Sequence, residues 1–179
     1  MSLKLVVLAL AFALLVYAVV RRAGFYRRFF SDPHLREVAS ALPALRRTGL
    51  DQLATTNPVE PRPVVSSLGL VILYTVRNNG EEGGFVHHLS VSLGGGYTPH
   101  GVGAYFLIFA LRGLGVDPRQ VGLGMSPSHI FHCEWTLSPT EEAEFAGREV
   151  PVIADVRAAW QECVQLRAQI RFDRTPAAG

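Results

Sequence analysis

The chain has 179 residues, of which 49% are hydrophobic and 18% charged, so it is long enough to bury one core and too apolar to be disordered throughout. Residues 1–47 contain Lys4 and seven arginines against Asp32 and Glu37, a net charge of +6, whereas the whole chain carries +2 and the remainder therefore −4. Because nucleic-acid binding needs a positive surface, this acidic remainder argues against nucleic acid as a partner of the folded domain.

The first stretch, residues 5–20, contains no charged side chain and would span about 24 Å as a helix, near the lower limit for crossing a bilayer core. It predicts a single-pass membrane anchor over residues 1–22. By the positive-inside rule, the arginines that follow place the C-terminal domain in the cytoplasm. They are Arg21, Arg22, Arg27 and Arg28. A cleaved signal peptide with secretion of the domain is the alternative, because residues 16–18 read Val-Tyr-Ala, the small-x-small pattern of a cleavage site.

A juxtamembrane segment is expected next. Its start interleaves aromatic rings with arginines, a pattern typical of the lipid headgroup layer. Asp32 followed by Pro33 predicts a short helix that ends or kinks at Pro43, and three prolines between positions 55 and 63 predict a stiff linker. The chain then divides into an anchor, this juxtamembrane helix and linker, a soluble domain and a flexible tail, over residues 1–22, 23–63, 64–172 and 173–179.

Two strands are predicted before the centre of the chain. Residues 64–77 are apolar on both alternating faces, as in a central strand or one covered on both sides. Residues 85–93 alternate between apolar and polar side chains, as in a half-buried strand. Residues 78–84, rich in Asn, Gly and Glu, indicate a turn between them, so the two strands should form an antiparallel hairpin.

A buried helix is predicted after this hairpin. Three glycines at positions 94–96 permit a sharp turn, Thr98 lies where an N-cap would, and Pro99 would occupy position N1. Residues 102–111 are almost entirely apolar, glycine or alanine, so this helix should have no solvated face. The side chains expected to pack against the sheet include Phe106 and Phe109.

The second half of the chain predicts one more full strand and two helices. Residues 121–127 fit a short edge strand, and residues 128–137 alternate again as a third strand. Residues 138–141 (Ser-Pro-Thr-Glu) form a capping box that opens a short helix ending at Gly147. A last helix follows Pro151. The predicted fold class is α+β, a small antiparallel sheet of about three strands covered by helices, in the order strand, strand, helix, strand, helix, helix.

Two histidines and a glutamate are the candidates for chemistry. If the second and third strands are neighbours, His88, His132 and Glu134 share one polar sheet face. Imidazole and carboxylate groups bind zinc or iron, or act as an acid–base pair. The alternative is an ordinary solvated sheet face, since the sequence has no His-Glu-x-x-His or comparable metal motif, and no cofactor is expected. His87 and His129 alternate onto the apolar faces, as core or edge histidines.

The glycine turn is the candidate binding surface. Backbone N–H groups at a helix start attract anions, but this turn lacks the Gly-Lys-[Ser/Thr] run of a phosphate-binding loop. Its large side chains either project from a rigid hinge for recognition or belong to a purely structural turn. The residues of this surface are Gly94, Gly95, Gly96, Tyr97, Thr98 and His100.

These signals favour a membrane-anchored, non-catalytic domain that binds another protein, as an accessory subunit or an immunity-type neutraliser. The alternative is a small metal-dependent hydrolase that uses His88, His132 and Glu134. Cys133 and Cys163 fall on the apolar sides of a strand and a helix, and predict either two buried thiols or one disulfide.

Overall fold

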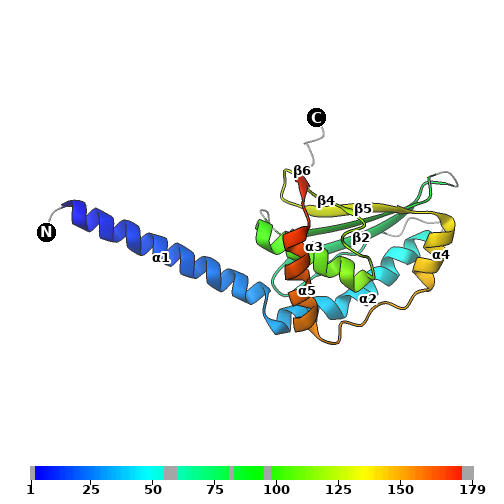
Figure 1. Ribbon diagram of the computed structural model, residues 1–179, viewed down its shortest axis with the longest axis horizontal. Helices are drawn as coiled ribbons and strands as arrows, with labels where there is room; N and C mark the ends of the chain where they lie inside the picture. The colour runs from blue at the N-terminus through cyan, green and yellow to red at the C-terminus, as the bar shows by residue number, and fades with distance from the viewer. Residues whose placement is uncertain (1–2, 55–59, 81–82, 95–97, 175–179) are drawn as a thin grey trace.

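A computed structural model describes residues 3–54, 60–80, 83–94 and 98–174 (Figure 1). The described strands form one sheet of six, in the order β1-β2-β3-β5-β4-β6. Neighbouring strands are antiparallel, except that β6 runs parallel to β4. In chain order the elements are α1 (Leu3–Phe29), α2 (Asp32–Ala54), β1 (Val64–Val65), β2 (Leu70–Asn78), β3 (Phe85–Leu93), α3 (His100–Leu114), β4 (Gly122–Met125), β5 (Phe131–Leu137), α4 (Pro139–Gly147), α5 (Val156–Gln169) and β6 (Asp173–Arg174).

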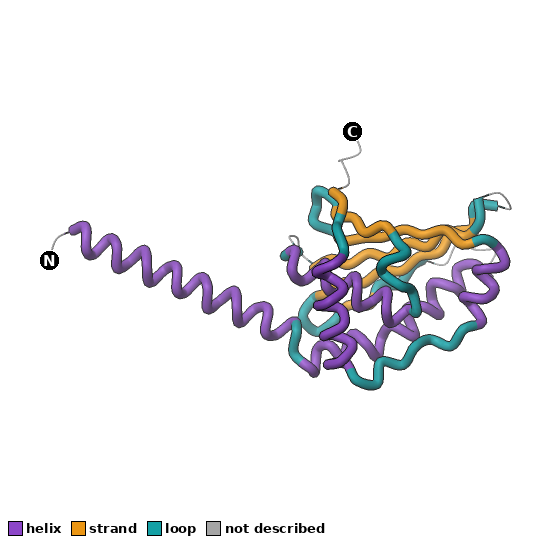
Figure 2. The backbone as a smooth tube through the Cα atoms, in the orientation of Figure 1, coloured by secondary structure: helices purple, strands orange, loops and turns teal. Residues whose placement is uncertain are grey.

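The fold is α+β, as predicted, with α2 to α5 on one side of the sheet (Figure 2). The sheet has more strands than the three expected, because β1, β4 and β6 are only two to four residues long and carry little periodic signal. The opposite face of the sheet carries no helix among the described elements (Figure 2). It is therefore a one-sided sheet, with an apolar face toward the helices and a mixed face toward solvent.

Helix α1 projects away from the sheet and the other helices (Figure 1). Within α1, residues Val6–Phe29 form a candidate membrane span. Its most apolar window has a mean hydropathy of 2.1 and no residue buried against the rest of the protein. By length and composition this helix can cross a membrane or serve as an N-terminal signal sequence.

Helix α2 is longer than predicted and belongs to the folded core. It continues through Pro43 to Ala54, although a proline inside a helix removes a backbone hydrogen bond and costs about 3 kcal/mol. Packing against β2 and α3 offsets this cost. α2 is therefore packed with the sheet and α3, ahead of the boundary expected after Pro63. The buried side chains of α2 include Leu35, Val38, Leu42 and Leu45.

The strand predicted over residues 64–77 is in fact two strands separated by a tight turn. Gly69 has a φ of 76°, a left-handed conformation that glycine adopts without strain. The backbone N–H of Ser66 donates to the carbonyl of Leu70 at 2.9 Å, which closes the turn. β1 thus folds back along β2, and β2 lies between β1 and β3 with one buried face.

The third predicted strand starts three residues late, at Phe131, because a turn precedes it. The N–H of His129 donates to the carbonyl of Ser126 at 2.9 Å, and His129 has a φ of 58°. His129 therefore lies in a turn and not on the apolar face of a strand. The short strand predicted within residues 121–127 is β4, which pairs antiparallel with β5 but is not the edge, since β6 lies beyond it.

Helix α3 begins at His100, one residue later than predicted. Pro99 occupies the N-cap position and forms no side-chain cap hydrogen bond. Thr98 is buried, and its hydroxyl accepts the backbone N–H of Leu93 at 2.9 Å. The threonine thus ties the start of α3 to the end of β3 instead of capping the helix.

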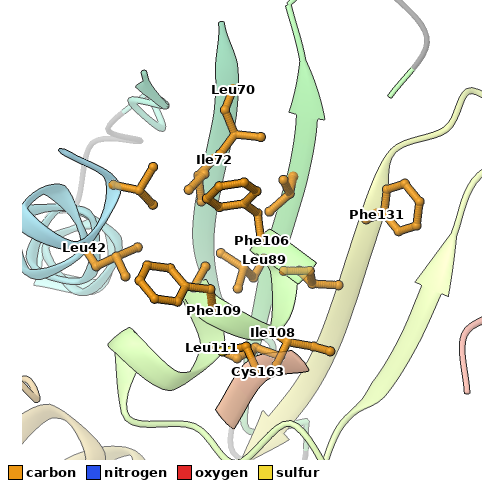
Figure 3. Close-up of a cluster of buried hydrophobic side chains, with 14 of the residues drawn as sticks. Leu42, Leu70, Ile72, Leu89, Phe106, Ile108, Phe109, Leu111, Phe131 and Cys163 are labelled. Atoms are coloured by element: carbon orange, nitrogen blue, oxygen red, sulfur yellow. The ribbon is translucent and has the colours of Figure 1, made fainter. Parts of the chain in front are cut away.

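The predicted enclosure of α3 is confirmed. Phe106 and Phe109 are fully buried, and they lie among the side chains of α2 and the sheet (Figure 3). A Cβ atom at Gly103 would overlap the ring of Phe131, so glycine at this position permits the close approach of α3 to β5.

The C-terminal elements follow their sequence signals, with one correction at the tail. The hydroxyl of Ser138 accepts the N–H of Glu141, whose carboxylate in turn accepts the N–H of Ser138, so the predicted capping box opens α4. α5 is capped by Asp155, whose carboxylate accepts two backbone N–H groups of the first turn. Of the tail predicted at 173–179, the first two residues form β6, and residues 175–179 lie outside the described residues.

Replacing Phe109 with alanine should lower the free energy of unfolding by about 3–5 kcal/mol, because it leaves a cavity between α3 and α2. Urea denaturation of the full chain in detergent, followed by far-UV circular dichroism, measures the change. Val164→Ala at an exposed position of α5 is the control, and should change stability by no more than about 0.5 kcal/mol. Equal midpoints for Phe109→Ala and the parent would contradict the burial of this face.

Candidate functional site

Strands β3 and β5 bring together the three residues predicted for metal or acid–base chemistry. His88 lies opposite Glu134, and Ser90 lies opposite His132, so the three side chains share the sheet face without helices. The ring centroids of His88 and His132 are 6.1 Å apart, and the ring planes meet at 25°. Among the described residues, no group of three His, Cys, Asp or Glu side chains is placed to hold a metal ion.

The electrostatics of this trio are those of a partly solvated surface. The carboxylate of Glu134 lies 3.7 Å from the guanidinium of Arg77, and both side chains are more than half exposed. Burial, and then the proximity of His132, lowers the pKa of His88 below its ordinary value of 6.5, so this imidazole is neutral at pH 7. A neutral imidazole can accept a proton, but acid–base catalysis also needs a second group aimed at the substrate.

The glycine-turn surface is only partly described. Thr98 is fully buried, and the N–H of Gly94 donates to a carbonyl of the β1–β2 turn at 2.8 Å. The ring of His100 packs edge-on against Phe131 and Phe172, with centroid distances of 5.3 Å and 6.1 Å. The described part of the turn thus links β3 to α3 through Thr98, while His100 is exposed beside these rings. The candidate residues that lie outside the described residues are Gly95, Gly96 and Tyr97.

A buried polar network that the sequence did not predict joins α2, β2, β3 and α4. His87 has no exposed surface; its Nδ1 lies 2.7 Å from the hydroxyl of Tyr74, and its Nε2 lies 2.6 Å from the carboxylate of Glu142. Arg46 is buried near that carboxylate. The Arg46 guanidinium donates to the backbone carbonyl of Phe145 and lies 4.2 Å from the centre of its ring.

The charges in this network compensate one another. Burial, and then the charge of Arg46, lowers the pKa of His87 to about 4, so its ring is neutral at pH 7. Nε2 then carries the ring proton and donates a hydrogen bond to the carboxylate of Glu142, while Nδ1 accepts a hydrogen bond from the hydroxyl of Tyr74. Burial raises the pKa of Glu142, and the charge of Arg46 opposes that rise. The network therefore links α4 to the sheet and sets the opposite charges of Arg46 and Glu142 near each other, while among the described residues Arg46 Nε and Glu142 Oε1 have no hydrogen-bond partner.

A row of aromatic rings leads from this network to a cavity at the end of the sheet. The rings of Tyr74, His87 and Trp135 stand nearly parallel on neighbouring strands, with 5.0 Å between the centroids of His87 and Trp135 and 11° between their planes. Trp135 also lines a cavity of about 340 Å³. The other walls are the loop between α3 and β4, the end of β5, and α4. Its volume suits a long side chain or a small ligand.

Acidic side chains outnumber basic ones around this cavity. Asp117, Glu141 and Glu144 line it, against Arg148. Asp117 is already paired with Arg119, so the local excess is one carboxylate. The C-terminal end of α3 adds to it, because the last carbonyls of a helix carry a partial negative charge. The cavity is therefore suited to a cation.

The two cysteines are structural. Cys133 on β5 and Cys163 on α5 are both buried and free, so the predicted disulfide alternative is not formed. Burial raises the pKa of each thiol to about 12, which keeps both protonated and unreactive at pH 7.

Two sequence signals point toward the buried network. His87 alternates onto the apolar face of its strand, and a buried imidazole needs hydrogen-bond partners. Trp135 alternates onto the same face of the next strand, directly opposite it. The partners Arg46 and Glu142 have no comparable signal, because helical charges are usually solvated.

No family model, no curated protein and no solved structure matches this chain.

The lowered pKa of His87 should make stability depend on pH. Between about pH 4 and pH 6.5, the unfolded chain binds a proton that the folded imidazole excludes, so unfolding becomes easier as the pH falls. We expect this group to remove about 2 kcal/mol of the free energy of unfolding between pH 6.5 and pH 4.5. Urea denaturation across this range should show a smaller loss for His87→Gln, which cannot titrate. An equal loss in parent and variant would mean that His87 does not titrate differently on unfolding.

Proposed function

We propose that this protein is a membrane-anchored, non-catalytic domain that binds a partner protein through a basic side chain of that partner. The cavity beside Trp135 carries the proposal, because it combines an aromatic wall, an excess of carboxylates and the C-terminal end of α3. A lysine or arginine side chain suits all three features. Its charge complements the carboxylates, and its apolar stem or guanidinium plane packs against an indole ring.

The position of the cavity favours a partner that approaches from solution. α1 leaves the domain at one end, and α4, which forms one wall of the cavity, lies at the opposite end (Figure 1). The net charge of −4 after residue 47 favours a basic partner through long-range attraction. An accessory subunit or an immunity-type neutraliser would have these properties.

A metal-dependent hydrolase has less support. The proximity of His88, His132 and Glu134 on one sheet face favours it. Against it, Glu134 is paired with Arg77, and His87, which is hydrogen-bonded to a carboxylate, has no exposed surface for a substrate. Both observations favour binding over catalysis.

The proposal places α1 across the membrane as a single span, with the domain in the cytoplasm, because Arg21 and Arg22 directly follow the apolar run. A C-terminal alkaline phosphatase fusion should therefore be inactive, and a green fluorescent protein fusion at the same position should fluoresce. The same phosphatase fusion behind a known secretory signal is the positive control. An active fusion to the natural chain, or a mature N-terminus at Val19, would show that the domain is translocated.

Peptide binding observed by NMR tests the cation site. In the full chain in micelles, Gly-Lys-Gly and Gly-Arg-Gly should shift the indole N–H resonance of Trp135, whereas Gly-Gln-Gly should not. A dissociation constant weaker than about 1 mM is expected, since 1 mM corresponds to about 4 kcal/mol and one cation on one ring contributes only about 0.5–2 kcal/mol. Trp160 is the internal control, because it is buried in the core and does not line the cavity.

Two exposed charge variants separate recognition from folding. Glu144→Gln should weaken binding severalfold, and Arg148→Gln should strengthen it, because the two changes alter the charge of the cavity in opposite directions. Both should leave the unfolding midpoint unchanged. Equal shifts with the glutamine peptide, or the same effect from both variants, would contradict the site. Stoichiometric zinc or iron in the purified full chain would favour the hydrolase instead.

A further inference from the structure

Four arginines surround α1 where its apolar run ends. They occupy positions 21, 22, 27 and 28, and all four side chains are exposed. At 100° per residue they point to different sides of the helix, within about 11 Å along its axis. Among the described residues, no carboxylate forms an ion pair with any of them. The chain thus leaves these charges for an anionic partner outside it.

Two cavities adjoin these arginines. One, of about 480 Å³, is lined by Arg21 and Arg22, by aromatic side chains of α1, and by Pro99 ahead of α3. The other, of about 570 Å³, is lined by Arg27 and Arg28 together with residues of the β1–β2 turn and of α2, among them Glu37, whose carboxylate accepts hydrogen bonds from the backbone and hydroxyl of Ser67. Each cavity therefore has a net positive charge and a wall that belongs to the folded domain, with two arginines in the first and two arginines against one glutamate in the second.

The junction between α1 and the domain is held by packing and hydrogen bonds. Phe29 is buried in the core, and the ring of Phe30 lies 4.6 Å from that of Trp160. His34 in α2 is buried, with Nδ1 2.7 Å from the carbonyl of Phe29 and Nε2 2.8 Å from the hydroxyl of Ser66. These contacts fix the direction in which α1 leaves the domain, so the two cavities keep their positions relative to the apolar run.

We infer that these two cavities bind the headgroups of anionic phospholipids. The inference rests on the proposed membrane anchoring, because an apolar run that spans the bilayer up to Val20 places Arg21 and Arg22 at headgroup depth. A guanidinium fork matches the oxygens of a phosphate, and the aromatic side chains of α1 suit the same layer. Lipids held in both cavities would keep the β1–β2 turn and the start of α3 against the membrane, with the Trp135 cavity pointing away from it.

Lipid competition in native mass spectrometry tests the inference. The full chain, released from detergent with equal amounts of phosphatidylglycerol and phosphatidylcholine, should retain phosphatidylglycerol preferentially. An arginine near an anionic surface contributes about a fivefold preference, so Arg21→Gln with Arg22→Gln should reduce the preference by about tenfold or more. Arg27→Gln with Arg28→Gln should do the same for the second cavity.

A matched control removes the same charge elsewhere. Arg36→Gln with Arg47→Gln alters two exposed positions of α2 that line neither cavity, and should leave the lipid preference unchanged. Circular dichroism should confirm that all three double variants are folded.

Four results would overturn the inference: equal retention of both lipids, an equal loss in the control, full displacement of the lipid by inorganic phosphate, or preferential binding of an RNA oligonucleotide at the same arginines. Cell fractionation distinguishes a wrong assignment of the headgroup sites from a wrong assignment of the membrane anchor. A chain found in the soluble fraction would contradict the membrane anchor, whereas a membrane-embedded chain without lipid preference would contradict only the headgroup sites.

Discussion

An apolar helix with no polar face cannot border water, and α3 is such a helix, with 11 buried residues among its 15. The sheet, α2 and α5 together enclose it. This requirement explains why α2 continues through Pro43, since ending the helix there would expose one side of α3. It also explains Gly103, which lets α3 lie close to Phe131 on β5. With the helices gathered around α3, the opposite sheet face stays open (Figure 2).

The polar network of Arg46, His87 and Glu142 is the second constraint on the domain. α4 is short, and it is attached to the sheet by the hydrogen bond between Glu142 and His87 and by the buried ring of Phe145, which packs edge-on against His87. The same network sets two walls of the Trp135 cavity. His87 stacks on Trp135, and Arg46 holds the backbone and ring of Phe145. A structural network is thus also the support of the proposed binding site.

The basic and acidic parts of the sequence lie at opposite ends of the folded domain. The arginines of α1 gather at the end of the domain from which that helix projects, and the acidic cavity lies beside α4 at the other end (Figure 1). A membrane surface and a basic partner would then be recognised at opposite ends by charges of opposite sign. The contacts of Phe30 and His34 fix α1 to the core at the first of these ends.

The sequence alone determined what depends on neighbours in the chain: the apolar run of α3, the capping box of α4, and the alternation that puts His88 on the polar face of one strand and His132 and Glu134 on that of another. Those signals are local or periodic. That these two strands are neighbours, so that the three side chains share one sheet face, came only from the tertiary structure. Only the tertiary structure decided the extent of α2, the turn that splits residues 64–77, and the buried network. The hydrogen bond between His87 on β3 and Glu142 on α4 joins side chains 55 positions apart. Burying such polar groups is favourable only when their partners are in place, and these partners lie on elements that meet only when the chain has folded.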